Sequence, residues 1–528
     1  MIKTFNEMYK QFVIENDEEY DLLYFNDTVV TNFDFIKRVD EIAKHLIRLG
    51  VRQGTGVGYT MNNNTDIIPL FIAIAKLGAY AVPQFAGIPP IARMDFYNKS
   101  KVRFVVTNES MVSALQTAGE KIEFIPEFIV VEKSQAYESI FGQPMEAIDL
   151  NEYSITGEEG DLPLMIASSS GTTGIPKMVC MTQTNVGSEM IVSKDMVEEV
   201  RKLLPSECKQ DSSSLAFPFS TSVMLVLCGM VFQKRTMVFS DDITPMNFLK
   251  DIERRKSKAI SCPPAYLESI LLLKDKNPYD LSSVTELGGG MDFCPPECIR
   301  RLKIMFPNLR AYSNGYGLVE TCNVYMHTAV DISGDEIKDT AKVRLAKHAD
   351  NVIMVKDEQG NEVEVGEVGE LYVKGPNVVK GYMSAPDTMM EAFHDGWLKT
   401  GDIAKKESDS CVTLLGRRKY FIKRGGKTIS PIVVQTEINK TQGVKASGVV
   451  GVPHPLYGEM IWAFVVKEEG SDISLKEVKK QCREQLPYYM IPDQVTFIDE
   501  IPKNPGVGKV DFETLRNMAK ECLGKNTQ

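Results

Sequence analysis

The stretch of this chain with the clearest chemical content is a run of hydroxyl residues and glycines that ends in a lysine, Ser168-Ser169-Ser170-Gly171-Thr172-Thr173-Gly174-Ile175-Pro176-Lys177. Glycine lets backbone N–H groups approach an anion closely, hydroxyls add donors, and lysine adds charge. The apolar residues 162–167 predict a buried strand that ends where this loop begins. A flexible surface loop has a similar composition, but the preceding strand and the Pro-Lys ending favour a phosphate-binding loop.

This loop differs from the Walker-type P-loop, which needs glycine where Pro176 stands and serine or threonine where Met178 stands. Proline also has no N–H to offer a phosphate. The run instead resembles the phosphate loop of the adenylate-forming superfamily, which includes acyl- and aryl-CoA synthetases, peptide-synthetase adenylation domains and beetle luciferases. The resemblance assigns phosphate contacts to Ser169, Ser170, Gly171, Thr172, Thr173, Gly174 and the catalytic Lys177.

A second match to this family lies at residues 312–320, Tyr-Ser-Asn-Gly-Tyr-Gly-Leu-Val-Glu. The resemblance implies that Tyr316 stacks on adenine, that Asn314 reads the adenine edge, and that the catalytic Glu320 holds Mg²⁺. An aromatic face suits a purine, and a carboxylate oxygen suits a hard cation. Val319 stands where the family usually has threonine. Glycines are expected to let the nucleotide and the acid approach the backbone at Gly288, Gly289, Gly290, Gly315 and Gly317.

Ribose contacts are expected from a third match, Gly396-Trp397-Leu398-Lys399-Thr400-Gly401-Asp402. A carboxylate can accept hydrogen bonds from both ribose hydroxyls, and the resemblance gives this role to Asp402. Arg417 is expected to contact ribose and phosphate. Alternation of apolar and polar residues over 367–374 predicts a small set of antiparallel strands beside this motif.

The acid pocket is expected around the segment 215–222, Leu-Ala-Phe-Pro-Phe-Ser-Thr-Ser. Ser220 stands where peptide-synthetase domains have an aspartate, and an α-ammonium group would need that buried carboxylate. The segment is similar to the aryl acid-AMP ligase branch, although Ala216 replaces the asparagine that binds a catechol hydroxyl there. An apolar core strand is the alternative interpretation. The predicted pocket residues are Ala216, Phe219, Ser220 and Gly288.

Cations are dense in the segment 415–427, which alone could be a solvated basic face or a nucleic-acid patch. The resemblance instead makes Lys419 the hinge of a mobile C-terminal domain. It makes Lys423 a catalytic residue that points into the site during thiol transfer, with Gly425 and Gly426 along the tunnel for the acceptor thiol. A later Pro/Gly-rich loop carries Lys509, the expected catalytic lysine, which would neutralise charge on the reacting oxygens.

Helices and strands alternate along the first third of the chain. Helical spacing over 31–50 and 67–76 is interleaved with strand-like segments at 57–61, 79–82, 102–107 and 128–131, which predicts a parallel sheet with crossover helices. A helix is expected over 185–204, close to the phosphate loop. The chain end predicts strands at 446–450 and 462–466 and a helix at 475–485. We therefore expect an α/β adenylation core, 1–417, and a small α+β domain, 418–528.

Composition limits the remaining possibilities. A net charge of −11 over 528 residues argues against nucleic acid or an anionic membrane as partner. The ten cysteines include no CxxC pair, and no two of the five histidines have metal-ligand spacing. The apolar run 223–232 is too short to span a bilayer, and the first residues do not resemble a signal peptide. A cytoplasmic location is expected.

The resemblance predicts a two-step reaction. A carboxylic acid, expected to be an aryl acid, attacks ATP in the presence of Mg²⁺ to give acyl-AMP and pyrophosphate. A phosphopantetheine thiol then takes the acyl group, either on an acyl or aryl carrier protein, the first expectation, or on CoA, the alternative. A luciferase-like oxygenase and a non-catalytic nucleotide-binding protein are the more distant alternatives.

Overall fold

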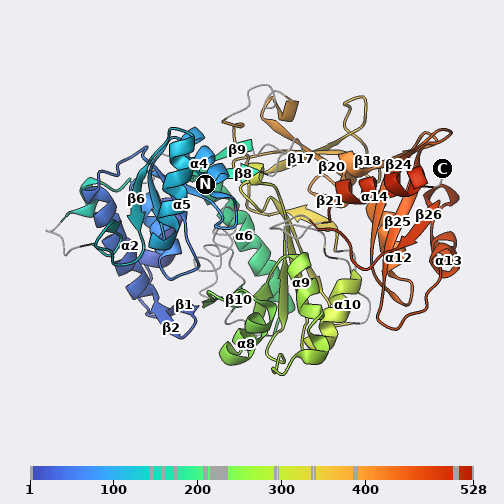
Figure 1. The fold of residues 1–528 in the computed structure, drawn as a ribbon, viewed down its shortest axis with the longest axis horizontal. Helices are drawn as coiled ribbons and strands as arrows, with labels where there is room; N and C mark the ends of the chain where they lie inside the picture. The colour runs from blue at the N-terminus through green and yellow to red at the C-terminus, as the bar shows by residue number, and fades with distance from the viewer. Residues whose placement is uncertain are drawn as a thin grey trace.

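The structure is a computed structural model that describes residues 4–142, 148–155, 161–169, 177–205, 212–214, 236–290, 294, 296–334, 337, 340–383, 391–503 and 510–525. Two sheets with their helices form a large N-terminal domain, and a third sheet forms a small C-terminal domain (Figure 1). The predicted fold class is confirmed. In the described part of the chain, none of the helices combines the length and the apolar character needed to cross a membrane.

The first sheet has seven strands among the described residues, in the order β7-β6-β5-β3-β4-β8-β9. The strands from β7 to β8 run parallel, and the helices α3, α4 and α5 connect β3, β4, β5 and β6, as the alternation in the sequence predicts. Nine of the ten residues of α3 are buried, because this helix packs between the sheet and α2. The elements are α2 (Asn32–Arg48), β3 (Gly56–Thr60), α3 (Ile67–Lys76), β4 (Tyr80–Pro83), α4 (Pro90–Lys99), β5 (Val102–Thr107), α5 (Glu109–Lys121), β6 (Glu127–Val130), β7 (Glu138–Ser139), β8 (Pro163–Ser169) and β9 (Lys177–Thr182).

The strand β9 was not expected from the sequence. It pairs with β8 in antiparallel register, with Ser169 opposite Lys177, so the phosphate loop connects two strands of a hairpin. The expected helix follows only after β9, as α6 (Gln183–Leu203). Thr182 caps this helix: its side chain accepts from the Asn185 N–H at 3.2 Å, and Asn185 accepts from the Thr182 N–H at 3.0 Å. The strand β9 therefore separates the phosphate loop from the predicted helix along the chain.

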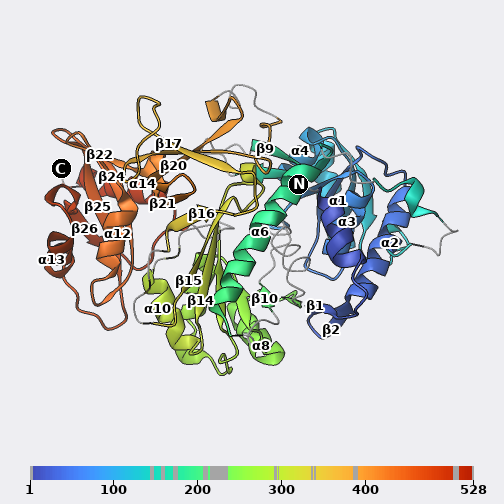
Figure 2. The ribbon, with the colours of Figure 1, turned by 180° about the vertical axis from the view of Figure 1, so that it is seen from behind.

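The second sheet has 14 strands among the described residues. Its strands β1, β10, β11, β12, β13 and β14 form parallel pairs, and those from β14 through β15, β16, β21, β20 and β18 to β17 form antiparallel ones. Helix α6 extends from the first sheet to this one, where it packs on β14 and β15 (Figure 2). Strands and helices are β1 (Asp21–Phe25), β2 (Thr28–Thr31), β10 (Ser212–Ser214), β11 (Met237–Phe239), α8 (Pro245–Arg255), β12 (Ala259–Ser261), α9 (Pro264–Leu271), β13 (Glu286–Gly289), α10 (Pro296–Met305), β14 (Ala311–Tyr316), β15 (Met326–Asp331), β16 (Lys342–Leu345), β17 (Val352–Lys356), β18 (Val368–Lys374), β19 (Phe393–His394), β20 (Trp397–Ser408) and β21 (Cys411–Arg417).

The C-terminal domain has a sheet with a helical layer on each face. Alternate residues of β25 point to opposite faces: Ile461, Ala463 and Val465 join the core that includes residues of α12 and α13, whereas Trp462 and Phe464 join the core against α14. The chain leaves the second sheet at the end of β21 and enters this one at β22. The elements are β22 (Ile422–Arg424), β23 (Lys427–Ile429), α12 (Pro431–Asn439), β24 (Val444–His454), β25 (Gly458–Lys467), α13 (Leu475–Gln485), β26 (Gln494–Phe497) and α14 (Phe512–Lys525).

Candidate active site

Three predicted nucleotide residues from three strands meet in one cluster. The Tyr316 hydroxyl at the end of β14 donates to Asp402 Oδ2 at 2.7 Å, and Arg417 Nε contacts Asp402 Oδ1 at 3.0 Å. Asp402 on β20 and Arg417 on β21 are opposite each other in the ladder. The strands β21, β16 and β15 separate β20 from β14, so a flat sheet would place β14 and β20 about 19 Å apart. The side-chain contact therefore requires the sheet to curl back on itself.

The part of β20 that presents Asp402 is fixed by hydrogen bonds around Gly401, where the pairing of β20 with β18 shifts register. The Thr400 hydroxyl donates to the Leu371 carbonyl at 2.7 Å and accepts from the Asp402 N–H at 3.1 Å. Gly401 has a φ of 75°, a conformation that favours glycine. Burial and the charge of Asp402 raise the pKa of Tyr316 well above its ordinary value, so the hydroxyl is a donor at neutral pH.

An unpaired polar atom lies beside this cluster. Asn314 Oδ1 is buried and has no hydrogen-bond partner within the described residues. A Cβ added to Gly289 on β13 would lie 2.9 Å from the Tyr312 hydroxyl and 3.4 Å from Asn314 Oδ1. The side chain that glycine lacks thus leaves room next to a buried acceptor, and the exocyclic amino group of adenine is a donor that fits there. Gly288 and Gly290 flank this position, at the end of β13.

Gly317, directly after β14, must be glycine for a simpler reason. A Cβ at this position would lie 1.5 Å from the carbonyl oxygen of Asn323, which is far inside van der Waals contact. The chain therefore turns tightly from Gly315 and Tyr316 into the short helical turn Val319–Thr321 that carries Glu320. Gly317, which the family resemblance assigns to the nucleotide site, thus also has a local steric role.

Tyr382, which has no role among the sequence-based predictions, contacts both Glu320 and Lys177. The Tyr382 hydroxyl donates to Glu320 Oε1 at 2.6 Å, and Lys177 Nζ lies 4.6 Å from the centroid of the Tyr382 ring. Burial and the neighbouring Glu320 carboxylate raise the pKa of Tyr382. Proteins commonly hold Mg²⁺ through one or two carboxylates together with substrate phosphates, and the buried Glu320 carboxylate fits this role.

The predicted hinge and tunnel residues lie at the start of the C-terminal domain. Lys419 is on the short turn Arg418–Tyr420, with Nζ 4.6 Å from the centroid of the Tyr420 ring. Gly425 and Gly426 form the turn between β22 and β23, with φ values of 53° and 76°. Lys423 is solvent-exposed, and its Nζ contacts Glu358 Oε1 at 3.2 Å and Thr428 Oγ1 at 2.8 Å. In this domain orientation Lys423 thus pairs with the hairpin between β17 and β18.

Several predicted residues fall outside the described part of the chain. For Ser169 the structure gives only the backbone pairing at the end of β8. The residues without a structural description are Ser170, Gly171, Thr172, Thr173, Gly174, Ala216, Phe219, Ser220 and Lys509.

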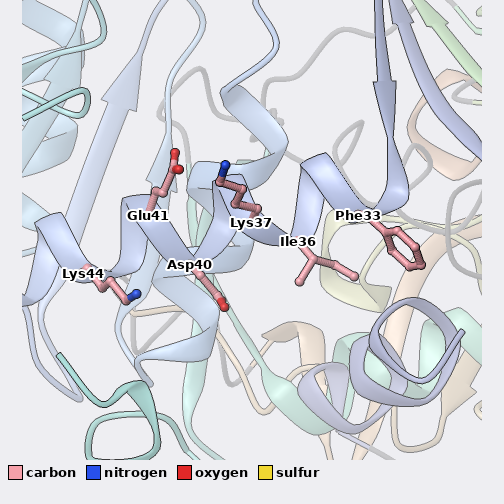
Figure 3. Close-up of a pocket in the computed structure, with 6 residues that line it drawn as sticks. All are labelled: Phe33, Ile36, Lys37, Asp40, Glu41 and Lys44. Carbon is pink, nitrogen blue, oxygen red and sulfur yellow. The ribbon is translucent and has the colours of Figure 1, made fainter. Parts of the chain in front are cut away.

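A shallow pocket of about 420 Å³ lies elsewhere, along the outer surface of α2 (Figure 3). Lys37 and Glu41 point to one side of the helix, and Asp40 and Lys44 point to the other. Alternating charges of this kind are typical of a solvated helix surface, so we assign no ligand to this pocket.

The curled second sheet, the cluster of Tyr316, Asp402 and Arg417, and the small α+β domain agree with the architecture expected of an adenylate-forming ligase. A family model for the AMP-binding enzyme matches residues 13–383, and a model for the AMP-binding enzyme C-terminal domain matches residues 434–507. The chain therefore belongs to the AMP-binding enzyme family. The prediction from the sequence motifs that the chain belongs to the adenylate-forming superfamily is confirmed.

Similar proteins support this assignment over nearly the whole chain. "Putative acyl--CoA ligase YdaB" of Bacillus subtilis (strain 168) is 28% identical over 519 residues, which cover 96% of this chain and 97% of that protein. Feruloyl-CoA synthase of Amycolatopsis sp is 26% identical over 500 residues, which cover 92% of each chain. The structure of amide bond synthetase McbA from Marinactinospora thermotolerans has a TM-score of 0.82 at 20% identity, covering 98% of this chain and 99% of that chain, and shows the same fold.

Proposed function

We propose that this enzyme activates an aryl carboxylic acid with Mg·ATP and transfers the acyl group to a phosphopantetheine thiol. The observation that carries the nucleotide assignment is the cluster of Tyr316, Asp402 and Arg417 beside Asn314 Oδ1, which has no hydrogen-bond partner among the described residues. A planar ring, a buried carboxylate, a guanidinium and an amide acceptor match the adenine, ribose and phosphate of one nucleotide. ATP as co-substrate agrees with membership of the AMP-binding enzyme family.

In the first step, an oxygen of the substrate carboxylate attacks the α-phosphorus of ATP in line, and pyrophosphate leaves. Lys177 and the loop before it are proposed to hold the β- and γ-phosphates, and Lys509 to neutralise charge between the carboxylate and the α-phosphate. Glu320 would hold Mg²⁺, which supplies positive charge to the phosphates. Asp402 and Arg417 fix the ribose, so the reacting phosphorus keeps its position relative to the protein.

In the second step, the thiol sulfur attacks the acyl carbon and AMP leaves. We propose that residues 418–528 rotate about Lys419 between the two steps, so that Lys423 and the turn at Gly425 and Gly426 come to line the path of the thiol. The ion pair of Lys423 with Glu358 is exposed on both sides, with side-chain exposures of 60% and 71%. Exposed pairs of this kind are worth about 1 kcal/mol or less, so the contact can break during such a rotation.

The assignment of the acid substrate and the assignment of the thiol acceptor rest on different observations. The aryl assignment comes from the sequence around Ala216, Phe219 and Ser220 and agrees with the name of feruloyl-CoA synthase, one of the relatives. Two full-length relatives are named as CoA ligases or synthases, which favours CoA as acceptor. The carrier protein, the first expectation from the sequence, is the second candidate because both acceptors present the same phosphopantetheine thiol.

The test is a pyrophosphate-release screen with ATP, Mg²⁺ and a panel of aryl, fatty and amino acids. We expect aryl acids to give the highest kcat/KM, and free CoA then to yield the acyl thioester and AMP. Preference for a fatty or amino acid would refute the aryl assignment. Thioester formation only on a phosphopantetheinylated carrier protein would show that the acceptor is the carrier protein and not CoA. Absence of pyrophosphate release with every acid would refute the proposed function.

A further inference from the structure

Tyr382 lies between the two side chains that are proposed to hold the metal and the triphosphate. Its hydroxyl donates to Glu320 Oε1 at 2.6 Å, and its ring face lies under Lys177 Nζ at 4.6 Å. We propose that Tyr382 is a positioning residue, which orients the Glu320 carboxylate and the Lys177 ammonium for Mg·ATP. This inference rests on the proposed function of that site.

The backbone around Tyr382 is fixed to both of these partners. In the segment 376–383, the buried Asn377 side chain donates to two carbonyls of the turn that follows Glu320, each at 3.2 Å. The Val379 N–H donates to the Glu320 carbonyl at 2.9 Å. Further along, Tyr382 forms a β-bridge with β9, the strand that begins at Lys177. The segment therefore ties the Glu320 turn to the end of the phosphate loop.

The two contacts of Tyr382 act differently on the two groups. A carboxylate has several acceptor positions, so the hydroxyl on Oε1 restricts rotation of Glu320 while the other oxygen keeps its lone pairs for a metal ion. The ring attracts the Lys177 ammonium without neutralising it, so the positive charge still acts on a phosphate. Phenylalanine at position 382 would keep only the contact with Lys177, and leucine would keep neither.

The matched control is Phe393, which packs edge-on against the same ring. The two ring centroids are 5.6 Å apart at an interplanar angle of 76°. The contacts that Tyr382 makes with Glu320 and Lys177 come from its hydroxyl and its face, so Phe393→Leu loosens the ring without removing either of them. A purely structural role of Tyr382 predicts similar effects of Tyr382→Phe and Phe393→Leu, whereas a positioning role predicts different ones.

The experiment measures ATP binding by calorimetry as a function of Mg²⁺ concentration, together with the kinetics of pyrophosphate release. We expect Tyr382→Phe to raise the Mg²⁺ concentration for half-maximal ATP binding by about tenfold or more, the usual effect of losing a hydrogen bond to a metal ligand. Excess Mg²⁺ should restore kcat to within about twofold. Tyr382→Leu should also raise KM for ATP, and excess Mg²⁺ should not correct this change, because the aromatic ring that contacts the Lys177 ammonium is lost.

Three results would overturn the inference: an unchanged Mg²⁺ dependence in Tyr382→Phe, equal shifts in Tyr382→Phe and Phe393→Leu, or ATP binding to the wild-type protein that does not depend on Mg²⁺. Failure of the proposed function would give a different result from failure of the role of Tyr382. In that case no acid gives pyrophosphate release with the wild-type enzyme, and the calorimetric Mg²⁺ dependence of ATP binding still decides the role of Tyr382.

Discussion

Replacing Asp402 by asparagine tests the ribose assignment with little change in side-chain volume. The carboxylate accepts from Tyr316 through one oxygen and contacts Arg417 through the other, and the residue is only 6% exposed. An asparagine amide has one acceptor oxygen, so its NH₂ group would face either the Tyr316 hydroxyl or the Arg417 guanidinium, which are both donors. The substitution therefore weakens the cluster and removes the charge that ribose hydroxyls would contact.

The expected magnitude follows from these contacts. A hydrogen bond to a charged group contributes about 1.5–3 kcal/mol, and a loss of about 2.5 kcal/mol in ATP affinity corresponds to a roughly 60-fold higher KM for ATP. The free energy of unfolding should fall by only about 1 kcal/mol, because Arg417 is half-exposed and can be solvated. The substitution should therefore reduce the free energy of ATP binding more than the free energy of unfolding.

The decisive assay compares ATP with 2′-deoxy-ATP and 3′-deoxy-ATP in pyrophosphate release. The wild-type enzyme should lose about tenfold or more in kcat/KM with at least one deoxy analogue, whereas Asp402→Asn should lose about twofold or less, because its partner for the hydroxyl is already impaired. Tyr316→Phe is the control that keeps the carboxylate and should retain the discrimination. Equal penalties for the analogues in the wild type and in Asp402→Asn would refute a contact between Asp402 and the ribose.

Three further predictions concern other parts of the chain. Lys509→Ala should lower acyl-AMP formation by about 100-fold or more while calorimetric ATP binding stays unchanged, and normal adenylation would contradict the catalytic assignment. Lys423→Ala should leave pyrophosphate release unchanged and slow thioester formation about tenfold, whereas Glu358→Ala should leave both rates unchanged; an equal loss in the two half-reactions would contradict the role in the second step. Burial lowers the pKa of His327, which contacts Asp195 at 2.8 Å, so the folded state resists protonation and the stabilisation present above pH 6.5 is lost as the pH falls. Between pH 7 and pH 5.5, the free energy of unfolding measured with urea should fall by about 1 kcal/mol less in His327→Gln than in the wild type. Equal falls in the two proteins would contradict this reasoning.

Regular elements were predictable where local pattern and flanking residues agree. The helix over 67–76 and the strand over 102–107 have the predicted bounds, and so does the helix over 475–485, whose start Ser474 caps. The strands expected at 446–450 and 462–466 are about twice as long in the structure, because they pair with each other along their full length as β24 and β25. Strand length depends on the partner strand, and a local pattern does not contain that information.

The candidate site was predictable as a set of separate motifs but not as an arrangement. Asp402 and Tyr316 are 86 residues apart in the chain, and their contact depends on the curl of the second sheet. Tyr382 follows a glycine in the sequence, but its partner Glu320 is 62 residues away, so local spacing gave no reason to select it. The roles given to the phosphate loop, the acid pocket and Lys509 came from residue chemistry together with family resemblance, and they stay predictions.

In the proposed mechanism, the curl of the second sheet also determines which contacts persist when the C-terminal domain rotates. Tyr316, Asp402 and Arg417 all belong to strands of that one sheet, and the chain changes to the next sheet only after Arg417. In the proposed mechanism, the three residues that would recognise adenosine therefore belong to one sheet, which ends just before the proposed hinge at Lys419. We expect the acyl-adenylate to stay bound to this sheet while the C-terminal domain rotates and presents a different set of side chains. The easily hydrolysed intermediate would then not be released into water between the two half-reactions.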